Sequence, residues 1–340
     1  MKNFNRDDAF SMSINDPENI DEFSKIIDSI VIGDELYIFK TKSVFRMLTA
    51  ESIDPDWSAL DTKHSYEKIS DFGTESEYIS RCILQAEKLL PVITKTEKFK
   101  SNVLEDLWEL NLKLLNCRNV VCDLDSHYST LIPKCNQIIL DNESSNVLPP
   151  LPKIPELEEK VRVFLTNSKL VLIALFKFLA KFYPLPIGDR GESHFNKHVK
   201  WFETNIGSEH NISKLLKADL EWIRLLSECR NAIEHSGKGQ KIDVVNFTLK
   251  PGNKFSPPNW TYDLTKKLGF KKGPHDLLND LDVLCSNMLH LVEDLILLVT
   301  QDKLVNHPLI AVYKVDEAKI NKECLINYDI TIKSNLSVGL

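Results

Sequence analysis

Helical spacing of apolar residues dominates the second half of the chain. From Glu156 to Tyr183 apolar side chains occupy nearly every face, which predicts a buried central helix. A shorter helix is expected from Phe195 to Phe202. Apolar residues recur at three- and four-residue intervals from Ile212 to Ile233, which predicts one amphipathic helix. Pro274 is expected to open a final long helix that ends near Thr300.

The first half of the chain has a more mixed pattern. A short helix is expected from Pro17 to Ile30, followed by a strand from Asp34 to Phe39. Residues from Glu75 to Leu90 have amphipathic helical spacing, and Thr94-x-x-Glu97 has the form of a capping box for the next helix. Proline, asparagine and serine are concentrated between Asp141 and Pro155, which predicts a linker or a long surface loop.

Two regions break the helical period. Residues Val244 to Leu264 surround a Pro-Gly-Asn turn and predict a hairpin, and residues Leu309 to Ile332 alternate as two short strands would. We therefore predict a mainly α-helical protein in four segments. These are a mixed α/β section of sensing or regulatory type at 1–91, a helix with a proline-rich linker at 92–155, a helical domain at 156–302 that contains a hairpin insertion at 243–272, and a β tail at 303–340.

Composition indicates a soluble chain with a sizeable core. Of the 340 residues 43% are hydrophobic, while the longest apolar run, Leu170 to Phe176, is far shorter than the ~20 residues of a membrane span. Acidic residues follow the first few positions, where an export signal would be apolar, so we expect a cytoplasmic protein that makes no membrane contact. The seven cysteines are scattered without Cys-x2-Cys spacing, so no zinc ribbon is predicted.

Positive charge is concentrated in one segment. The net charge is -7, but residues 236–272 hold eight lysines against two aspartates, a local balance of +6. Aromatic residues alternate with these lysines, as in segments that stack bases and contact phosphates. An equally weighted alternative is that the aromatics pack the hairpin and the lysines are merely solvated. The candidate RNA-binding residues are Lys238, Lys241, Lys250, Lys254, Trp260, Lys266 and Lys267.

The segment Arg230-Asn231-Ala232-Ile233-Glu234-His235 carries residue types suited to RNA cleavage without a metal. In such cleavage the ribose 2′-hydroxyl attacks the adjacent phosphate. Histidine as a residue type exchanges protons near neutral pH, and arginine offers a planar set of donors to phosphate oxygens as charge builds. Arg230 and His235 are therefore candidate catalytic residues, with Asn231 in a supporting role.

The spacing of the motif constrains this hypothesis. Residues i and i+5 lie about 140° apart on a regular helix, so Arg230 and His235 do not share a face unless the helix ends between them. Gly237 and Gly239 predict such an end. Asn231 is an i, i+4 neighbour of His235 and is placed to orient its imidazole. The alternative is structural: Arg230 pairs with Glu234, and His235 only caps the helix.

An arginine, a polar residue and a histidine at the end of a helix resemble the Arg-x4-His signature of the HEPN superfamily. The resemblance covers residues 156–302 and implies a helical bundle, a composite active site across a homodimer, and ribonuclease activity in phage defence, abortive infection or a toxin–antitoxin system. It also implies an antitoxin or regulatory partner. Two alternatives stay open: a HEPN-like module that dimerises or binds a protein without catalysis, and an RNA-binding protein that does not cleave.

The remaining sequence motifs give weaker indications of a functional site. Glu192, His194 and His198 sit on one predicted helix, but a solvated helix face is favoured over a metal site, so no metal is predicted. Cys117-Arg118-Asn119 repeats Cys229-Arg230-Asn231, and coincidence is favoured over a second, degenerate unit. There is neither a P-loop nor a dinucleotide-binding glycine motif, so no cofactor is predicted.

Overall fold

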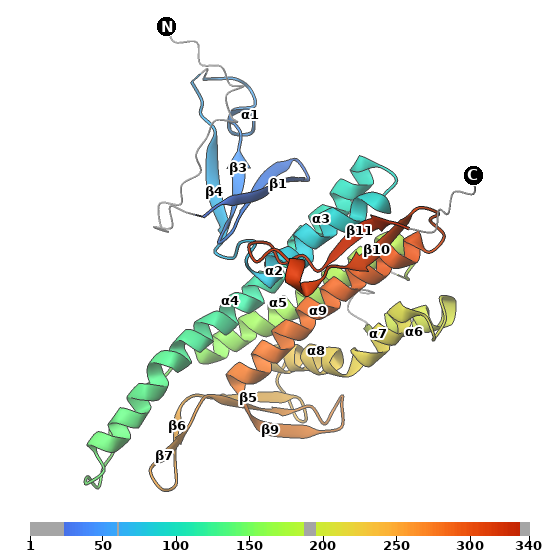
Figure 1. Ribbon diagram of the computed structural model, residues 1–340. Helices are drawn as coiled ribbons and strands as arrows, with labels where there is room; N and C mark the ends of the chain where they lie inside the picture. Colours follow the sequence, from blue (N-terminus) through green and yellow to red (C-terminus); the bar gives the residue numbers. More distant parts are fainter. Residues whose placement is uncertain (1–23, 60, 187–194, 334–340) are drawn as a thin grey trace, which may run out of the picture. The chain divides into compact units, whose positions relative to one another are not determined.

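The computed structural model describes residues 24–59, 61–186 and 195–333. The chain forms two compact units: unit 1 is Met1–Asn111 with Glu293–Leu340, and unit 2 is Leu112–Val292. Two long helices, α4 (Glu97–Asp141) and α9 (Leu277–Leu304), contribute residues to both units (Figure 1). The division falls inside these helices, not at the predicted boundaries 91, 155 and 302. The protein is mainly α-helical with a mixed α/β N-terminal section.

Unit 1 contains an antiparallel sheet in the order β1-β2-β3-β4. Its strands are β1 (Ile26–Ile32), β2 (Glu35–Lys40), β3 (Val44–Leu48) and β4 (Ser65–Ser70), with the single turn α1 (Ala50–Ile53) after β3. Gly33 makes the β1–β2 turn with a φ of +63°, a conformation that favours glycine. Phe39 of β2 and Phe45 of β3 are among the fully buried side chains, so a shift in the pairing of these strands would move large apolar side chains out of the core.

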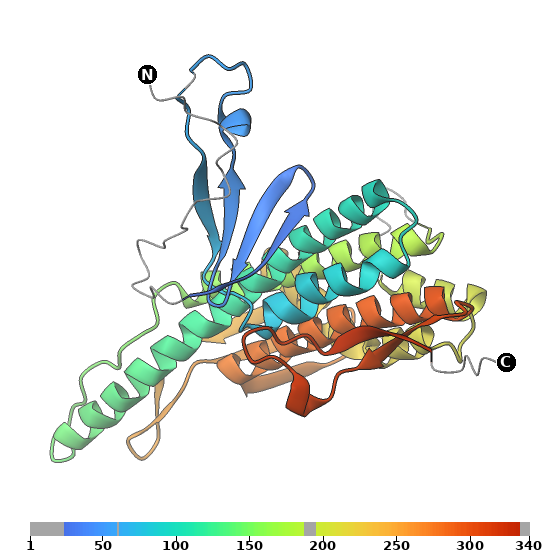
Figure 2. The same ribbon diagram turned by 45° about the horizontal axis from the view of Figure 1, so that its top comes forward.

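Helices and a C-terminal hairpin complete unit 1. One nearly continuous helical stretch consists of α2 (Glu77–Ile79), a π-helical segment (Ser80–Leu84), α3 (Gln85–Leu89) and a 3-10 turn (Leu90–Val92). The hairpin of β10 (Ile310–Lys314) and β11 (Tyr328–Ile332), with a 3-10 turn (Glu317–Lys319) between them, lies beside α3 (Figure 2). Buried Gln85 joins the two: its Oε1 accepts the backbone N–H groups of Asn327 and Tyr328 at 3.0 and 2.9 Å.

Unit 2 is built around α5 (Leu157–Phe182), which confirms the predicted helix. Its buried positions recur every three or four residues, whereas Val163 and Leu170 are 38% and 39% exposed, so the expected burial on nearly every face is not found. Around it are α6 (Phe195–Asn205), α7 (Asn211–Ala218) and α8 (Leu220–Glu234), with α8 in contact with α5. The prediction of a single helix from Ile212 to Ile233 is wrong, because the chain turns at Asp219 and forms α7 and α8 instead. Asp219 keeps right-handed helical angles (φ -85°, ψ -7°), so the apolar spacing continues almost unchanged through the break.

Two small sheets follow α8 in unit 2. One has the antiparallel order β5-β8-β9, with β5 (Lys241–Val245), β8 (Asn259–Asp263) and β9 (Lys271–Asp276). The other is the hairpin of β6 (Thr248–Lys250) and β7 (Lys254–Ser256), which turns at the predicted Pro-Gly-Asn. Pro274 lies in β9 and does not open a helix, which corrects the prediction. The helix begins at Leu277 because Asp276 Oδ1 accepts the N–H of Asn279 at 2.8 Å.

Most other predicted elements are confirmed. The strand near Asp34–Phe39, the helix near Phe195, the two strands of the tail and the break from Asp141 to Pro155 are all present. The helix expected from Pro17 to Ile30 is wrong over its described part, because β-branched residues from Ile26 onward pair with β2 as a strand. Its first residues lie outside the described ranges. Thr96, not Thr94, accepts the N–H of Phe99 at the start of α4.

Two of the described helices, Leu157–Phe182 and Leu277–Leu304, are long and apolar enough to cross a membrane. Half of the apolar window in the first and 67% of that in the second are buried inside the protein. Length and apolar composition are therefore only weak evidence that either helix spans a membrane.

Candidate functional site

The predicted motif lies at the C-terminal end of α8. The helix ends at Glu234, and His235 caps it with non-helical angles (φ -133°, ψ 64°) while its N–H donates to Asn231 O at 2.9 Å. The chain then turns through a bridge between Gly237 and Gln240 and enters β5. The predicted helix end near Gly237 is therefore confirmed, and His235 does not continue the helical face.

The alternative pairing of Arg230 with Glu234 is not formed, because Glu234 has a different partner. Glu234 forms its ion pair with Arg162 of α5 at 3.6 Å, and Arg162 also donates to Ile233 O at 3.5 Å. Arg230 is half-buried, and its Nε has no hydrogen-bond partner among the described residues. A buried N–H of a charged group without a partner is costly, so this guanidinium is suited to donate a hydrogen bond to a ligand oxygen.

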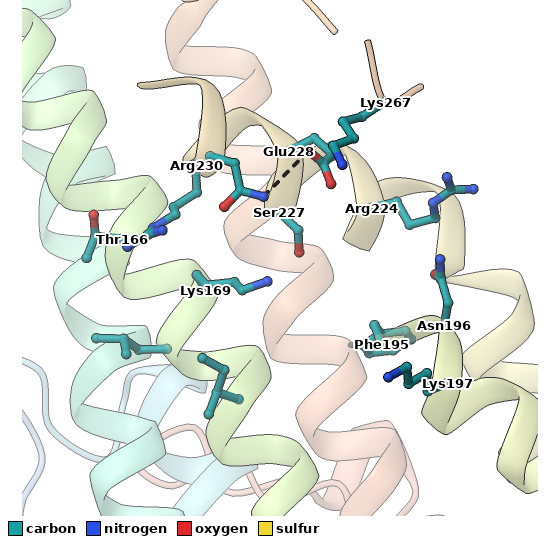
Figure 3. Close-up of a pocket in the computed structure, with 13 residues that line it drawn as sticks. Thr166, Lys169, Phe195, Asn196, Lys197, Arg224, Ser227, Glu228, Arg230 and Lys267 are labelled. Carbon is teal, nitrogen blue, oxygen red and sulfur yellow. Dashed lines mark hydrogen bonds between the residues drawn. The ribbon is translucent and has the colours of Figure 1, made fainter. Parts of the chain in front are cut away.

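Arg230 lines a cavity of about 730 Å³ within unit 2 (Figure 3). Four segments of the chain form its wall: α5, the start of α6, α8, and the turn between β8 and β9. The described lining residues are Thr166, Lys169, Leu170, Ile173, Phe195, Asn196, Lys197, Arg224, Ser227, Glu228, Arg230, Asn231 and Lys267. Residues 166, 169, 170 and 173 share one face of α5, and residues 224, 227, 228 and 231 share one face of α8.

The described wall of this cavity is strongly cationic. It has five basic side chains, and Glu228 is the one carboxylate among them. Figure 3 shows Lys169 extending from α5 toward α8, across from Ser227. Burial lowers the pKa of the Lys169 ammonium; Glu228 opposes that shift and Arg230 adds to it. The cavity thus holds basic groups close enough to disfavour one another, and a bound anion relieves that repulsion.

Three of the predicted site residues meet at this cavity: Arg230, Asn231 and Lys267. His235 does not line it and is exposed to solvent. The side-chain amide of Asn231 donates to Glu228 Oε2 at 3.5 Å, the dashed line in Figure 3, and so does not orient the imidazole as we predicted. Within the motif, Arg230 and Asn231 therefore lie at the cavity, whereas His235 lies outside it and is exposed to solvent.

The predicted RNA-binding residues between Lys238 and Lys267 are exposed, with the exception of Trp260. Lys238, Lys241, Lys250, Lys254 and Lys266 are exposed, and Lys241 pairs with Asp243 at 2.5 Å. Trp260 corrects the prediction. It is 1% exposed and its Nε1 donates to Asp280 Oδ2 at 2.8 Å, so its ring belongs to the core and offers no face for a base. It was mistaken for a binding residue because a two-residue period does not say which face of a strand is buried.

The weaker motifs have structural roles. The predicted solvated helix face is wrong at His198, which is fully buried and stacks on Phe176 with ring centroids 4.3 Å apart. Glu192 and His194 lie outside the described residues. Arg118 is paired with Asp282 at 2.6 Å, and Cys117 is buried. Within the described ranges no group of three or more His, Cys, Asp or Glu side chains is arranged to hold a metal ion.

Sequence reasoning missed most of the cavity. Lys169, Arg224 and Lys197 were not singled out, although two signals were present. Lys169 interrupts the most apolar helix of the chain, and α8 carries a polar stripe opposite its buried residues Ile223, Leu226 and Cys229. Neither signal indicates that these faces of α5 and α8 line the same cavity, because that depends on how the helices pack in the tertiary structure.

Comparisons with family models, with curated proteins and with solved structures find no match for this chain. The resemblance of residues 230–235 to the HEPN signature accordingly remains a hypothesis based on a short motif. The function is inferred from the site's own geometry and charge.

Proposed function

We propose that this protein is a metal-independent endoribonuclease of HEPN type that binds RNA phosphate in the cationic cavity of unit 2. One observation carries the proposal: Arg230, whose Nε lacks a partner among the described residues, lines that cavity together with four other basic side chains. A concentration of arginine and lysine in a concave site favours phosphate, and the planar guanidinium suits two phosphate oxygens at once.

The proposed reaction needs no metal. The ribose 2′-oxygen forms a bond to phosphorus, the bond from phosphorus to the 5′-oxygen breaks, and the products are a 2′,3′-cyclic phosphate and a 5′-hydroxyl. One basic group accepts the 2′-proton and one acidic group supplies a proton to the leaving oxygen. In this proposal His235 performs a proton transfer and Arg230 stabilises the negative charge that builds on the phosphate.

The proposal includes a second copy of the chain. Because His235 is exposed and outside the cavity wall, the proposed active site brings the motifs of two protomers together in a homodimer of HEPN-like bundles. The corresponding biological role is cytoplasmic, in abortive infection or a toxin–antitoxin system, with an antitoxin or regulatory protein as partner. The exposed lysines of β5 and the β6–β7 hairpin add positive charge for the RNA backbone.

The position of His235 also favours a second candidate. With the histidine outside the cavity and no bond from Asn231 to its imidazole, the same basic cavity serves an RNA-binding protein that does not cleave, or an interaction module that retains a HEPN-like bundle.

Cleavage of single-stranded RNA and transfer RNA in EDTA tests the proposal. Wild type, Arg230→Ala and His235→Ala are compared, with His127→Ala as the control. His127 lies on α4 in the same unit and outside the cavity. We expect cyclic phosphate ends from wild type and His127→Ala. We expect a loss of about 100-fold or more in His235→Ala, the usual size for a proton-transfer group, and a similar loss in Arg230→Ala, which removes a group that stabilises the developing charge.

The outcomes separate the candidates. RNA binding that depends on Arg230, without cleavage by any variant in vitro or in a growth assay, favours the non-cleaving protein. Cleavage that persists in His235→Ala at the wild-type rate contradicts the proposed mechanism. Sedimentation of wild type measures the dimer, and a monomer that cleaves at full rate contradicts the composite site.

A further inference from the structure

We propose that the cationic cavity binds a nucleotide with a terminal di- or triphosphate, either a free nucleoside triphosphate or the 5′-triphosphate end of an RNA. This inference rests on the proposed function, because it concerns the same site, and names the chemical class that fills it.

Charge density is the first reason. The described wall holds Lys169, Lys197, Arg224, Arg230 and Lys267 against Glu228, an excess of four positive charges around one cavity. An internal phosphodiester brings one negative charge per nucleotide. A terminal polyphosphate concentrates several charges on adjacent phosphorus atoms, and so matches a cluster of five cations around one cavity better than a single phosphodiester does.

The arrangement of these cations supports a compact ligand. They come from four separate segments of the chain and converge on the same cavity, with Lys169 on α5, Lys197 on α6, Arg224 and Arg230 on α8, and Lys267 on the β8–β9 turn. In Figure 3 the ammonium of Lys169 extends into the space between α5 and α8. A groove that follows a polynucleotide would instead spread its basic residues along a line.

The wall also has a part suited to a nucleoside. Leu170 and Ile173 of α5 and Phe195 of α6 add apolar surface to the wall, and Leu170 is 39% exposed although it is a large apolar side chain. The amides of Asn196 and Asn231 and the hydroxyl of Thr166 add donors and acceptors to the same wall. An apolar wall with a few polar groups is the usual composition of small-molecule sites.

The volume agrees with a single nucleotide. About 730 Å³ lies inside the range of roughly 300–1,000 Å³ that small-molecule sites occupy. A cavity of this size has room for one nucleotide and its phosphates.

Binding measurements on the full-length protein in EDTA test the inference. The probes are a fluorescent adenosine triphosphate, adenosine monophosphate, inorganic tripolyphosphate, and one short RNA with either a 5′-triphosphate or a 5′-hydroxyl. We expect the nucleoside triphosphate to bind at least tenfold more tightly than the monophosphate and more tightly than tripolyphosphate. Tighter binding of the 5′-triphosphate RNA than of the free nucleotide identifies the RNA end as the ligand, and the reverse identifies the free nucleotide.

Variants assign the binding to the cavity. Lys169→Ala and Arg224→Ala are each expected to weaken triphosphate binding about tenfold or more, in line with the loss of a charge-assisted hydrogen bond. Lys134→Ala removes an exposed lysine of α4 outside the cavity and is expected to change nothing. Lys169→Gln, which keeps the length of the side chain, provides a second variant if the alanine form does not fold.

Two results overturn the inference. One is a triphosphate affinity no greater than that of the monophosphate, and the other is a triphosphate affinity unchanged in Lys169→Gln and Arg224→Ala. Cleavage of 5′-hydroxyl RNA with no triphosphate binding removes the inference and leaves the ribonuclease. Triphosphate binding at the cavity without any RNA cleavage supports the inference and contradicts the proposed ribonuclease activity.

Discussion

At the scale of single residues, Lys169 links the electrostatics of the cavity to its ligand. It lies on a largely apolar helix, and its pKa is lowered chiefly by burial, with Arg230 adding to the shift and Glu228 opposing it. A bound phosphate stabilises the protonated ammonium and raises that pKa again. Anion binding is therefore coupled to proton uptake by Lys169.

The affinity of the cavity for a triphosphate should decline with rising pH. Below the pKa of Lys169 in the unliganded protein the ammonium is charged and binding is at its strongest. As pH rises through that lowered pKa, binding first has to restore the proton, so affinity decreases before an ordinary lysine would titrate. Calorimetry at constant ionic strength from pH 7 to about 10 measures this change in affinity. The range lies below lysine's reference pKa of about 10.4, so an ordinary lysine stays mostly charged in it.

Lys169→Arg provides the control for this pH dependence. Its guanidinium keeps its charge over the whole range, so we expect a much flatter profile. Equal slopes in wild type and Lys169→Arg would show that Lys169 is not the source of the pH dependence.

At the scale of elements, the end of α8 decides what the motif does. Its helical residues bring Arg230 and Asn231 to the cavity, and the change of direction at His235 takes the imidazole away from it. The turn after it is held by contacts of Gly239, whose carbonyl accepts the N–H of Lys266 at 2.9 Å, next to the cavity residue Lys267. The sequence predicted the end of the helix because glycine is a strong local signal, but not the side on which His235 emerges.

Gly239→Ala should destabilise this turn, whereas Gly237→Ala should not. Gly239 has a φ of +70°, and an added Cβ would lie 2.6 Å from Thr265 Oγ1; the space beside Gly237 is open. We expect Gly239→Ala to lower the free energy of unfolding by about 1–3 kcal/mol and to weaken phosphate binding through Lys267. Urea denaturation measures the first effect. A Gly237→Ala variant that loses as much stability would contradict this account.

At the scale of the whole molecule, residues from both ends of the described chain build unit 1. Arg81, in the π-helical segment, bonds Glu293 of α9 with its Nε at 2.8 Å and Glu77 with Nη1 at 2.7 Å. Asn327, from the segment before β11, donates to the other oxygen of Glu293 at 2.7 Å. Burial opposes the charge of Arg81, but the bonds and attraction from Glu293 outweigh it, so its pKa is raised.

Breaking this pair from one side should be costly. Glu293→Ala leaves Arg81, which is 9% exposed, without its buried partner, and we expect a loss of about 3–5 kcal/mol in the free energy of unfolding. The double variant Arg81→Met with Glu293→Leu should recover much of that loss, because no unpaired charge stays buried. Chemical denaturation of wild type, Arg81→Met, Glu293→Leu and the double variant measures the coupling. Additive losses would show that the pair contributes little.

The sequence by itself determined the periodic elements: α5, the strand pairs of the tail, the break after α4, and the glycine-marked end of α8. These depend on the spacing of apolar residues and on local backbone preferences, which neighbouring residues already specify. The break at Asp219 and the strand position of Pro274 escaped prediction because their local signals resemble those of the structures expected there.

Only the tertiary structure decided how the candidate site is composed. It joined Lys169 of α5 and Arg224 of α8 with the predicted Arg230 in one cavity, excluded His235 from its wall, and buried Trp260 in the core. Each of these outcomes depends on which faces of distant segments pack together. A linear pattern shows that a helix has an apolar face and a polar one, but the partner of each face is selected by packing across the whole fold.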